Sequence, residues 1–224
     1  MSTGPTGNQP RFHWIPRLIK AHALVDGGTR LAQRQETALL GAKAGCGQGC
    51  DACPGAGRNT GCHQRNVSLT AVELAGALWH LDRHVSGEVR DAALERLAQA
   101  AGPGGNAGGC PFSHQGNCLV HPMRFMACRQ LFVADSVCPS APDTGSFRRA
   151  GVLTPLRQFT LRAFSLLLPF YGISGTLHDP LYLEALLREL SVPVSAWSVA
   201  DPAALLFDVE HARLRPRTLA PRAA

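Results

Sequence analysis

All eight cysteines of this 224-residue chain lie between residues 46 and 138, and their placement constrains the fold more than any other feature. They form a compact first cluster, CGQGCDACPGAGRNTGC at 46–62, and a wider second cluster at 110–138. Two thiolates from one short turn can reach the same ion, whereas widely spaced thiolates must be brought together by the fold. The window therefore predicts a metal-organising module. The expected ligands are Cys46, Cys50, Cys53, Cys62, Cys110, Cys118, Cys128, Cys138 and His121.

The cellular compartment decides how these thiols are interpreted. The start of the chain has no apolar run behind a basic segment, so we expect a cytoplasmic protein without a secretory signal. The longest apolar block, 161–173, is interrupted by Arg162 and Ser165 and falls short of the roughly 20 residues that a membrane helix needs, so no membrane partner is expected. In a reducing cytosol clustered thiols favour metal binding over the alternatives, which are disulfides, a redox relay or inert buried thiols.

The identity of the metal stays open at this level. Eight thiolates can serve two four-coordinate zinc sites, one or two iron–sulfur clusters, or a shared polynuclear iron site. Soft sulfur ligands argue against magnesium and calcium. Eight thiolates with two divalent ions would lower the formal net charge of +6 to about +2. The basic composition is therefore weak support for nucleic-acid binding, and we do not expect a nucleic-acid partner.

The apolar pattern predicts a mainly α protein: a single helical domain, over 17–212, with irregular Gly-rich cysteine loops. Residues 1–16 and the basic tail 213–224 are expected to be flexible. Gly27–Gly28 is expected to break or kink the first helical stretch, with Thr29 capping its second part. Further helices are expected at about 70–85, after a capping box of Thr70 and Glu73, at about 86–101, and after Thr154-Pro155, Asp179-Pro180 and Asp201-Pro202.

Cys128 has an interpretable setting. The dipeptide His121-Pro122 is expected to open a helix on which Arg124 lies four residues before Cys128, on the same face. A guanidinium in that position would favour the thiolate, and Arg124 and Arg129 are the expected cofactor-binding residues. The alternative is that Arg124 is a solvated surface cation.

Other histidines and catalytic patterns carry less information. His63 is most simply a surface loop residue, and no metal-ligand spacing singles out His22, His80, His84, His178 or His211. The chain has neither a P-loop nor a G-x-S-x-G elbow, and its GPGGNAGG run at 102–109 lacks the preceding strand and following helix of a nucleotide-binding loop. Asp51 and Glu73 are interpreted as a loop acid and a helix cap rather than as catalytic groups.

The order of residues in the second cluster resembles the bacterial cysteine-cluster proteins of the YkgJ family, described as zinc- or iron-chelating domains and including flagellin lysine-N-methylase. That pattern has Cys-Pro-Phe/Leu, a spacer, Cys-x-Ile-Tyr-x-x-Arg-Pro-x-x-Cys-Arg and a later Cys. The residues in register are Cys110-Pro111-Phe112, Cys118, Val120, Arg124, Cys128-Arg129 and Cys138. Upstream, Cys50, Cys53, Cys62 and the Leu69-Thr70-x-x-Glu73 helix start are also similar.

The chain departs from this family at three places. His121 replaces Tyr, Phe125 replaces Pro, and eight residues separate Cys53 from Cys62 where the family has adjacent cysteines. The substitution suggests that His121 is itself a ligand. The resemblance implies metal binding and, for an enzyme, methyl transfer from S-adenosylmethionine to a lysine of a protein substrate. The alternatives are a structural zinc module that mediates protein or nucleic-acid interaction, and a metal-handling or redox protein.

Overall fold

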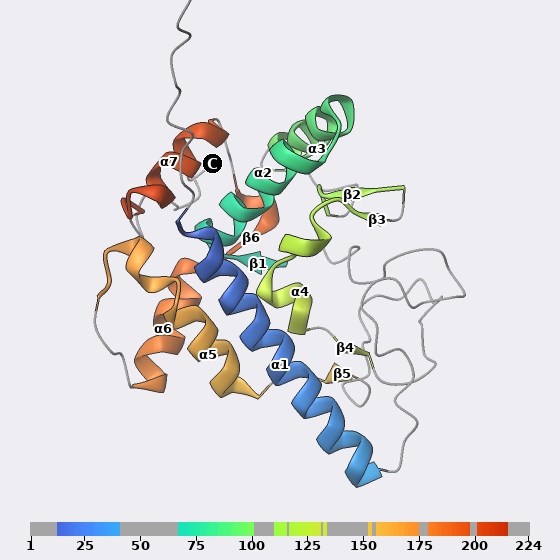
Figure 1. Ribbon diagram of the computed structural model, residues 1–224, viewed down its shortest axis with the longest axis vertical. Coiled ribbons are helices and arrows are strands. Elements are labelled where there is room, and N and C mark those ends of the chain that lie inside the picture. The colour runs from blue at the N-terminus through green and yellow to red at the C-terminus, as the bar shows by residue number, and fades with distance from the viewer. Residues whose placement is uncertain are drawn as a thin grey trace, which may run out of the picture.

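The computed structural model describes residues 13–40, 67–100, 110–115, 117–130, 132–133, 152–153, 156–174, 179–197 and 201–214, and the account below is confined to them. These residues form a mainly α protein, as expected (Figure 1). The α-helices are α1 (Ile15–Leu40), α2 (Ala71–His84), α3 (Gly87–Ala100), α4 (Met126–Gln130), α5 (Arg157–Ser165), α6 (Pro180–Leu190) and α7 (Pro202–Glu210). No helix in these ranges has the length and apolar character needed to cross a membrane.

Helix α1 is continuous through Gly27–Gly28, so the first alternative, a break into two helices, is wrong. Packing accounts for a glycine at position 28: α5 approaches α1 so closely that a Cβ on Gly28 would lie 2.6 Å from Cβ of Phe159, whereas a Cβ on Gly27 would meet nothing within 4 Å. Thr29 is not a cap either. Its hydroxyl lies 3.0 Å from the carbonyl oxygen of Val25 and 3.2 Å from that of Arg129, so it links α1 to α4.

Helices α2 and α3 match the helices predicted at about 70–85 and 86–101, and α2 starts at the predicted capping box. The Thr70 hydroxyl accepts from the Glu73 backbone N–H, while the Glu73 carboxylate accepts from the Thr70 N–H at 2.9 Å. The next backbone N–H, that of Ala71, donates to the buried Tyr171 hydroxyl at 3.0 Å. The N-terminus of α2 is therefore satisfied by side chains from two distant parts of the chain.

Two of the three predicted Pro-initiated helices are confirmed. Asp179 accepts from the Leu181 N–H at the start of α6, and Asp201 accepts from the Ala203 and Ala204 N–H groups at the start of α7. The third is wrong in its start, because α5 begins at Arg157 with Leu156 as a cap that makes no side-chain hydrogen bond.

The strands in the described residues are short and form three antiparallel pairs of two residues each. β1 (Ser68–Leu69) pairs with β6 (Val192–Pro193), β2 (Ser113–His114) with β3 (Asn117–Cys118), and β4 (Phe132–Val133) with β5 (Val152–Leu153). The described residues also include the 3₁₀ segments η2 (His121–Met123), η4 (Leu168–Tyr171) and η5 (Val194–Ala196). The β1–β6 pair fixes the entry to α2 against the segment that follows α6.

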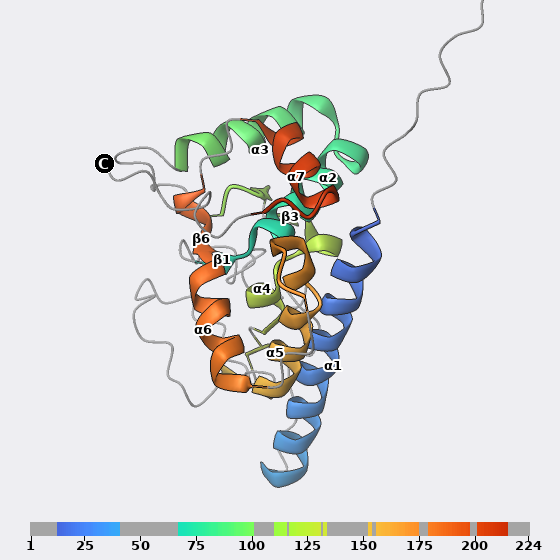
Figure 2. The same ribbon diagram turned by 90° about the vertical axis from the view of Figure 1, so that its left-hand side faces the viewer.

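The helices pack around one apolar core. Figure 2 shows α5 between α1 and α6, and α7 against α2, in agreement with the contacts between these elements. Trp14, at the start of α1, is 1% exposed, and Leu18 and Val25 on the same helix are fully buried. The second cysteine segment adds Phe112 and Phe125 to this core, with their rings edge to face at 5.7 Å.

Candidate metal centre

The second cysteine cluster is built into the fold by backbone hydrogen bonds. Cys110 precedes the β2–β3 hairpin, Cys118 ends β3 and Cys128 lies in α4, and all three are half-buried. The Cys110 carbonyl accepts from the Ser113 N–H at 3.0 Å. From α3, Arg96 donates to the carbonyl oxygens of Pro111 and Ser113 at 3.0 and 3.3 Å, which fixes the hairpin on α3.

The expected helix from Pro122 through Cys128 is wrong. Pro122 opens only the 3₁₀ turn η2, and Arg124 follows it in an extended conformation with φ −56° and ψ 146°. Helix α4 then begins at Met126. Arg124 therefore does not share a helix with Cys128. Its Nη1 lies 3.1 Å from Nε2 of His121, and because a guanidinium only donates, Nε2 is the acceptor.

This contact bears on His121 as a ligand. The Nε2 lone pair that accepts from Arg124 is the one that would bind a metal through Nε2, so metal binding through that atom would require the hydrogen bond to break. The Arg124 side chain is not the solvated surface cation of the alternative interpretation, because it is partly buried and its Nε is fully enclosed.

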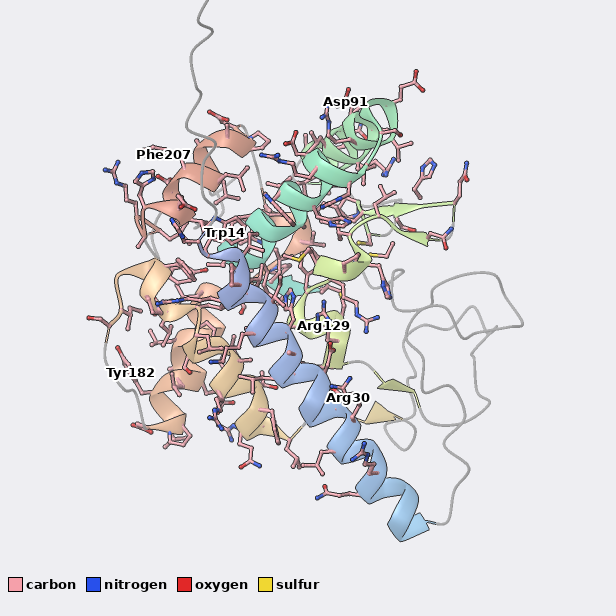
Figure 3. The ribbon with its side chains drawn as sticks, viewed as in Figure 1. Trp14, Arg30, Asp91, Arg129, Tyr182 and Phe207 are labelled. Carbon is pink, nitrogen blue, oxygen red and sulfur yellow. The ribbon has the colours of Figure 1, made fainter. Side chains whose placement is uncertain are left out.

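Arg129 joins three separate pieces of backbone and side chain around the second cluster. Its Nη1 donates to Oδ2 of Asp26 on α1 at 2.7 Å, its Nη2 donates to the Pro122 carbonyl at 2.7 Å, and its Nε donates to the Arg124 carbonyl at 2.9 Å. Its side chain is only 8% exposed, beside α1 in Figure 3. A planar guanidinium suits this task because its donors point in fixed directions. Arg129, predicted to contact a cofactor, thus holds the η2–α4 turn against α1.

Glu73 connects the start of α2 to the same segment. Its Oε2 accepts from Thr70, and its Oε1 accepts from the Met126 N–H at 2.6 Å, so one carboxylate satisfies the N-termini of both α2 and α4. The residue is 2% exposed, and burial raises the pKa of this carboxyl above its usual range, opposed by the hydrogen bonds from Thr70 and Met126 and by the charge of Arg129. The helix-cap prediction for Glu73 is confirmed, and the contact to α4 is additional.

His22 is a buried histidine near the candidate centre that the spacing of cysteines and histidines in the sequence did not single out. It lies on α1, is 3% exposed, and neither Nδ1 nor Nε2 has a hydrogen-bond partner among the described atoms. Burial, together with the nearby charges of Arg129 and Arg124, lowers the pKa of this imidazole to about 3, so it is neutral at pH 7. Helical spacing could have indicated its burial, because His22 follows the buried Leu18 by four residues and precedes the buried Val25 by three.

The Nε of Arg124 is a second buried nitrogen without a partner in the described part of the chain, and its charge acts on His22. Buried polar atoms are nearly always hydrogen-bonded in folded proteins, so unpartnered ones mark places where a further group fits. Thiolates or cluster sulfides would meet this requirement, because they accept hydrogen bonds and carry the negative charge that a guanidinium attracts. The donor set beside the second cluster therefore fits a thiolate-held metal.

The structure describes four of the nine predicted ligands: Cys110, Cys118, Cys128 and His121. Among the residues that the structure describes, no three His, Cys, Asp or Glu side chains come close enough together to hold a metal ion. The other predicted ligands lie outside the described residues; they are Cys46, Cys50, Cys53, Cys62 and Cys138. Met123, Phe125 and Met126, which lie between Cys118 and Cys128 in the chain, are all buried.

Comparison of the chain with protein-family models, with characterised proteins and with solved structures gave no match. The interpretation of the candidate centre therefore depends on the residues and contacts described above. The similarity to the YkgJ family remains one of residue order in the cysteine segments.

Proposed function

We propose that this protein binds a metal through its cysteine clusters, either iron as an iron–sulfur cluster or zinc. The observation that carries the proposal is the fixing of the second cysteine segment by buried charged side chains. Glu73 holds the N-terminus of α4, the helix that carries Cys128, and Arg129 holds the η2–α4 turn that precedes this helix. Metal ligands are commonly oriented in this way by hydrogen-bonded groups behind them.

The positive charges near Cys128 in the chain also support the proposal. Two guanidiniums, those of Arg124 and Arg129, lie in the segment that contains Cys128, and Asp26 is the carboxylate paired with Arg129. Positive charge next to a thiol lowers the free energy of its thiolate, which is the form that binds metal. An anionic thiolate cluster would also offset the charge of Arg124.

Analysis of the anaerobically purified protein distinguishes the iron–sulfur form from the zinc module. Anaerobically purified protein that is brown, with iron and acid-labile sulfide, supports the iron–sulfur form and excludes the structural zinc module. Colourless protein with about two zinc ions per chain supports the zinc module, and a chelator should then unfold the chain. A protein without bound iron or zinc would contradict the proposal.

The role of Cys128 is tested by Cys128→Ala, with His114→Gln in the β2–β3 hairpin as the matched control. We expect the cysteine variant to lose metal and the control to retain it. Unchanged metal content in Cys128→Ala would exclude this cysteine as a ligand. The methyl transfer implied by the family resemblance would be tested on the loaded protein with S-adenosylmethionine and lysine-containing protein substrates.

A further inference from the structure

A pair of histidines in the C-terminal half of α2 is separate from both cysteine clusters in sequence and has no part in the proposed centre. His80 and His84 are four residues apart, so they lie on the same face of the helix, one turn from each other. Their ring centroids are 4.7 Å apart and the ring planes are inclined by 35°. His80 is half-buried and His84 is exposed, so the pair can be reached from solvent.

Although the sequence pattern alone did not single out His80 and His84, their rings lie one helical turn apart in the structure. Two imidazoles at this spacing on a helix form a chelating pair, because rotation about their side-chain bonds can direct one nitrogen of each toward a common ion. Imidazole is a ligand for zinc, nickel and copper, and the coordination positions that the pair does not fill can be taken by water.

The charged neighbours of the pair do not oppose a divalent cation. Arg83, beside His84, lies 3.8 Å from a carboxylate oxygen of Asp82. Arg90, from the first turns of α3, lies 3.4 Å from Asp82 and 3.0 Å from Asp91. The two guanidiniums around the histidines are thus matched by two carboxylates, and the helix C-terminus, where His84 is the last residue, carries partial negative charge that attracts a cation.

We propose that His80 and His84 form a surface site for a divalent first-row transition ion such as zinc or nickel, independent of the cysteine centre. Trp79 supplies a local reporter, because its ring packs edge to face on His84 with centroids 5.6 Å apart. The other two tryptophans are buried elsewhere: Trp14 lies at the start of α1 and Trp197 follows η5.

The test is a fluorescence titration of the full-length, metal-loaded protein with nickel ions, which quench nearby indole emission and do not oxidise thiols as copper does. We expect saturable quenching that zinc reverses by competition, and that disappears in Trp79→Phe. Both His80→Gln and His84→Gln should weaken nickel binding by about tenfold or more, since loss of even an outer-shell partner costs about 10- to 100-fold. His114→Gln should leave the titration unchanged.

The same titration of Cys128→Ala separates this site from the cysteine centre, because its quenching curve should match that of the unmodified protein even if its own metal is lost. Absence of saturable quenching in the unmodified protein would overturn the proposal. So would quenching that persists at the same nickel concentration in both histidine variants.

Discussion

The carboxylate of Glu73 accepts a hydrogen bond from the backbone N–H of Met126 at 2.6 Å, across 53 residues of sequence. The same side chain completes the capping box at Thr70. A residue that a local motif identifies as a helix cap is therefore also the support of the helix that carries Cys128. Substitutions around this contact provide direct tests of how the candidate centre is held.

Replacement of Glu73 by Gln should flatten the pH dependence of stability. Because burial raises the pKa of this carboxyl in the folded state, the folded protein holds its proton more tightly than the unfolded chain. The stabilising contribution is full below the unfolded pKa of 4.5 and is lost as the pH rises from there through the raised folded pKa. Urea unfolding of Glu73→Gln across this range should lack that decline, whereas the exposed Glu95→Gln should behave as the unmodified protein. Parallel pH profiles for Glu73→Gln and the unmodified protein would contradict the assignment.

Replacement of His22 by Leu should remove a loss of stability on the acid side. The pKa of His22 is lowered from 6.5 to about 3, so its contribution is full above pH 6.5 and is lost as the pH falls toward 3. Each unit of this shift corresponds to about 1.4 kcal/mol. Denaturant unfolding at pH 7 and pH 4.5 should show a smaller difference for His22→Leu than for the control His13→Leu, since His13 is exposed. An equal difference in the two variants would show that His22 is not buried in neutral form.

Replacement of Arg129 by Lys should loosen the second cysteine segment although the charge is kept. An ammonium cannot reproduce the fork that serves Asp26, Pro122 and Arg124, and a buried acceptor left without a donor costs about 1–3 kcal/mol. Hydrogen exchange should be faster in α4, and the metal content of the purified protein should fall. The exposed Arg188→Lys on α6 is the matched control. Exchange rates in α4 equal to those of the control would show that the guanidinium geometry is not required.

Alanine at the two adjacent glycines of α1 should have opposite effects. At Gly27 the new Cβ meets no atom within 4 Å, and Ala should stabilise the helix by about 0.5–1 kcal/mol. At Gly28 the new Cβ would be 2.6 Å from Cβ of Phe159, which cannot move without shifting α5, and overpacking of this kind costs about 1–3 kcal/mol. Thermal unfolding of the two variants measures the difference directly. A stabilising Gly28→Ala would mean that α5 does not approach α1 this closely.

The features that could be predicted from the sequence are those with local causes. The capping box at Thr70 and the Asp-Pro starts of α6 and α7 were correct because the side chain and the backbone groups it satisfies are within three residues of each other. The mainly helical class followed from apolar periodicity in the same way.

The features that could not be predicted depend on distant residues. Gly28 lies within a continuous helix and allows Phe159 of α5 to pack on it, and no local signal at Gly27–Gly28 reports that contact. The helix expected after Pro122 stops because Arg124 is extended, which directs its carbonyl to Nε of Arg129. The ion pair of Arg129 with Asp26 joins residues 103 positions apart, so the polar support of the candidate centre could not be read from the cysteine spacing.

The position of α1 also sets an order of events during synthesis. Its buried face packs on α4 and α5, which begin more than 100 residues after α1 begins. At a translation rate of about 5–20 residues per second, the ribosome completes those partners roughly 5–30 seconds after the first turn of α1. During that interval Leu18 and Val25 lack the contacts that bury them, and Asp26 lacks Arg129. A nascent chain of this protein is therefore a candidate for chaperone binding at its first helix until residue 165 has left the exit tunnel.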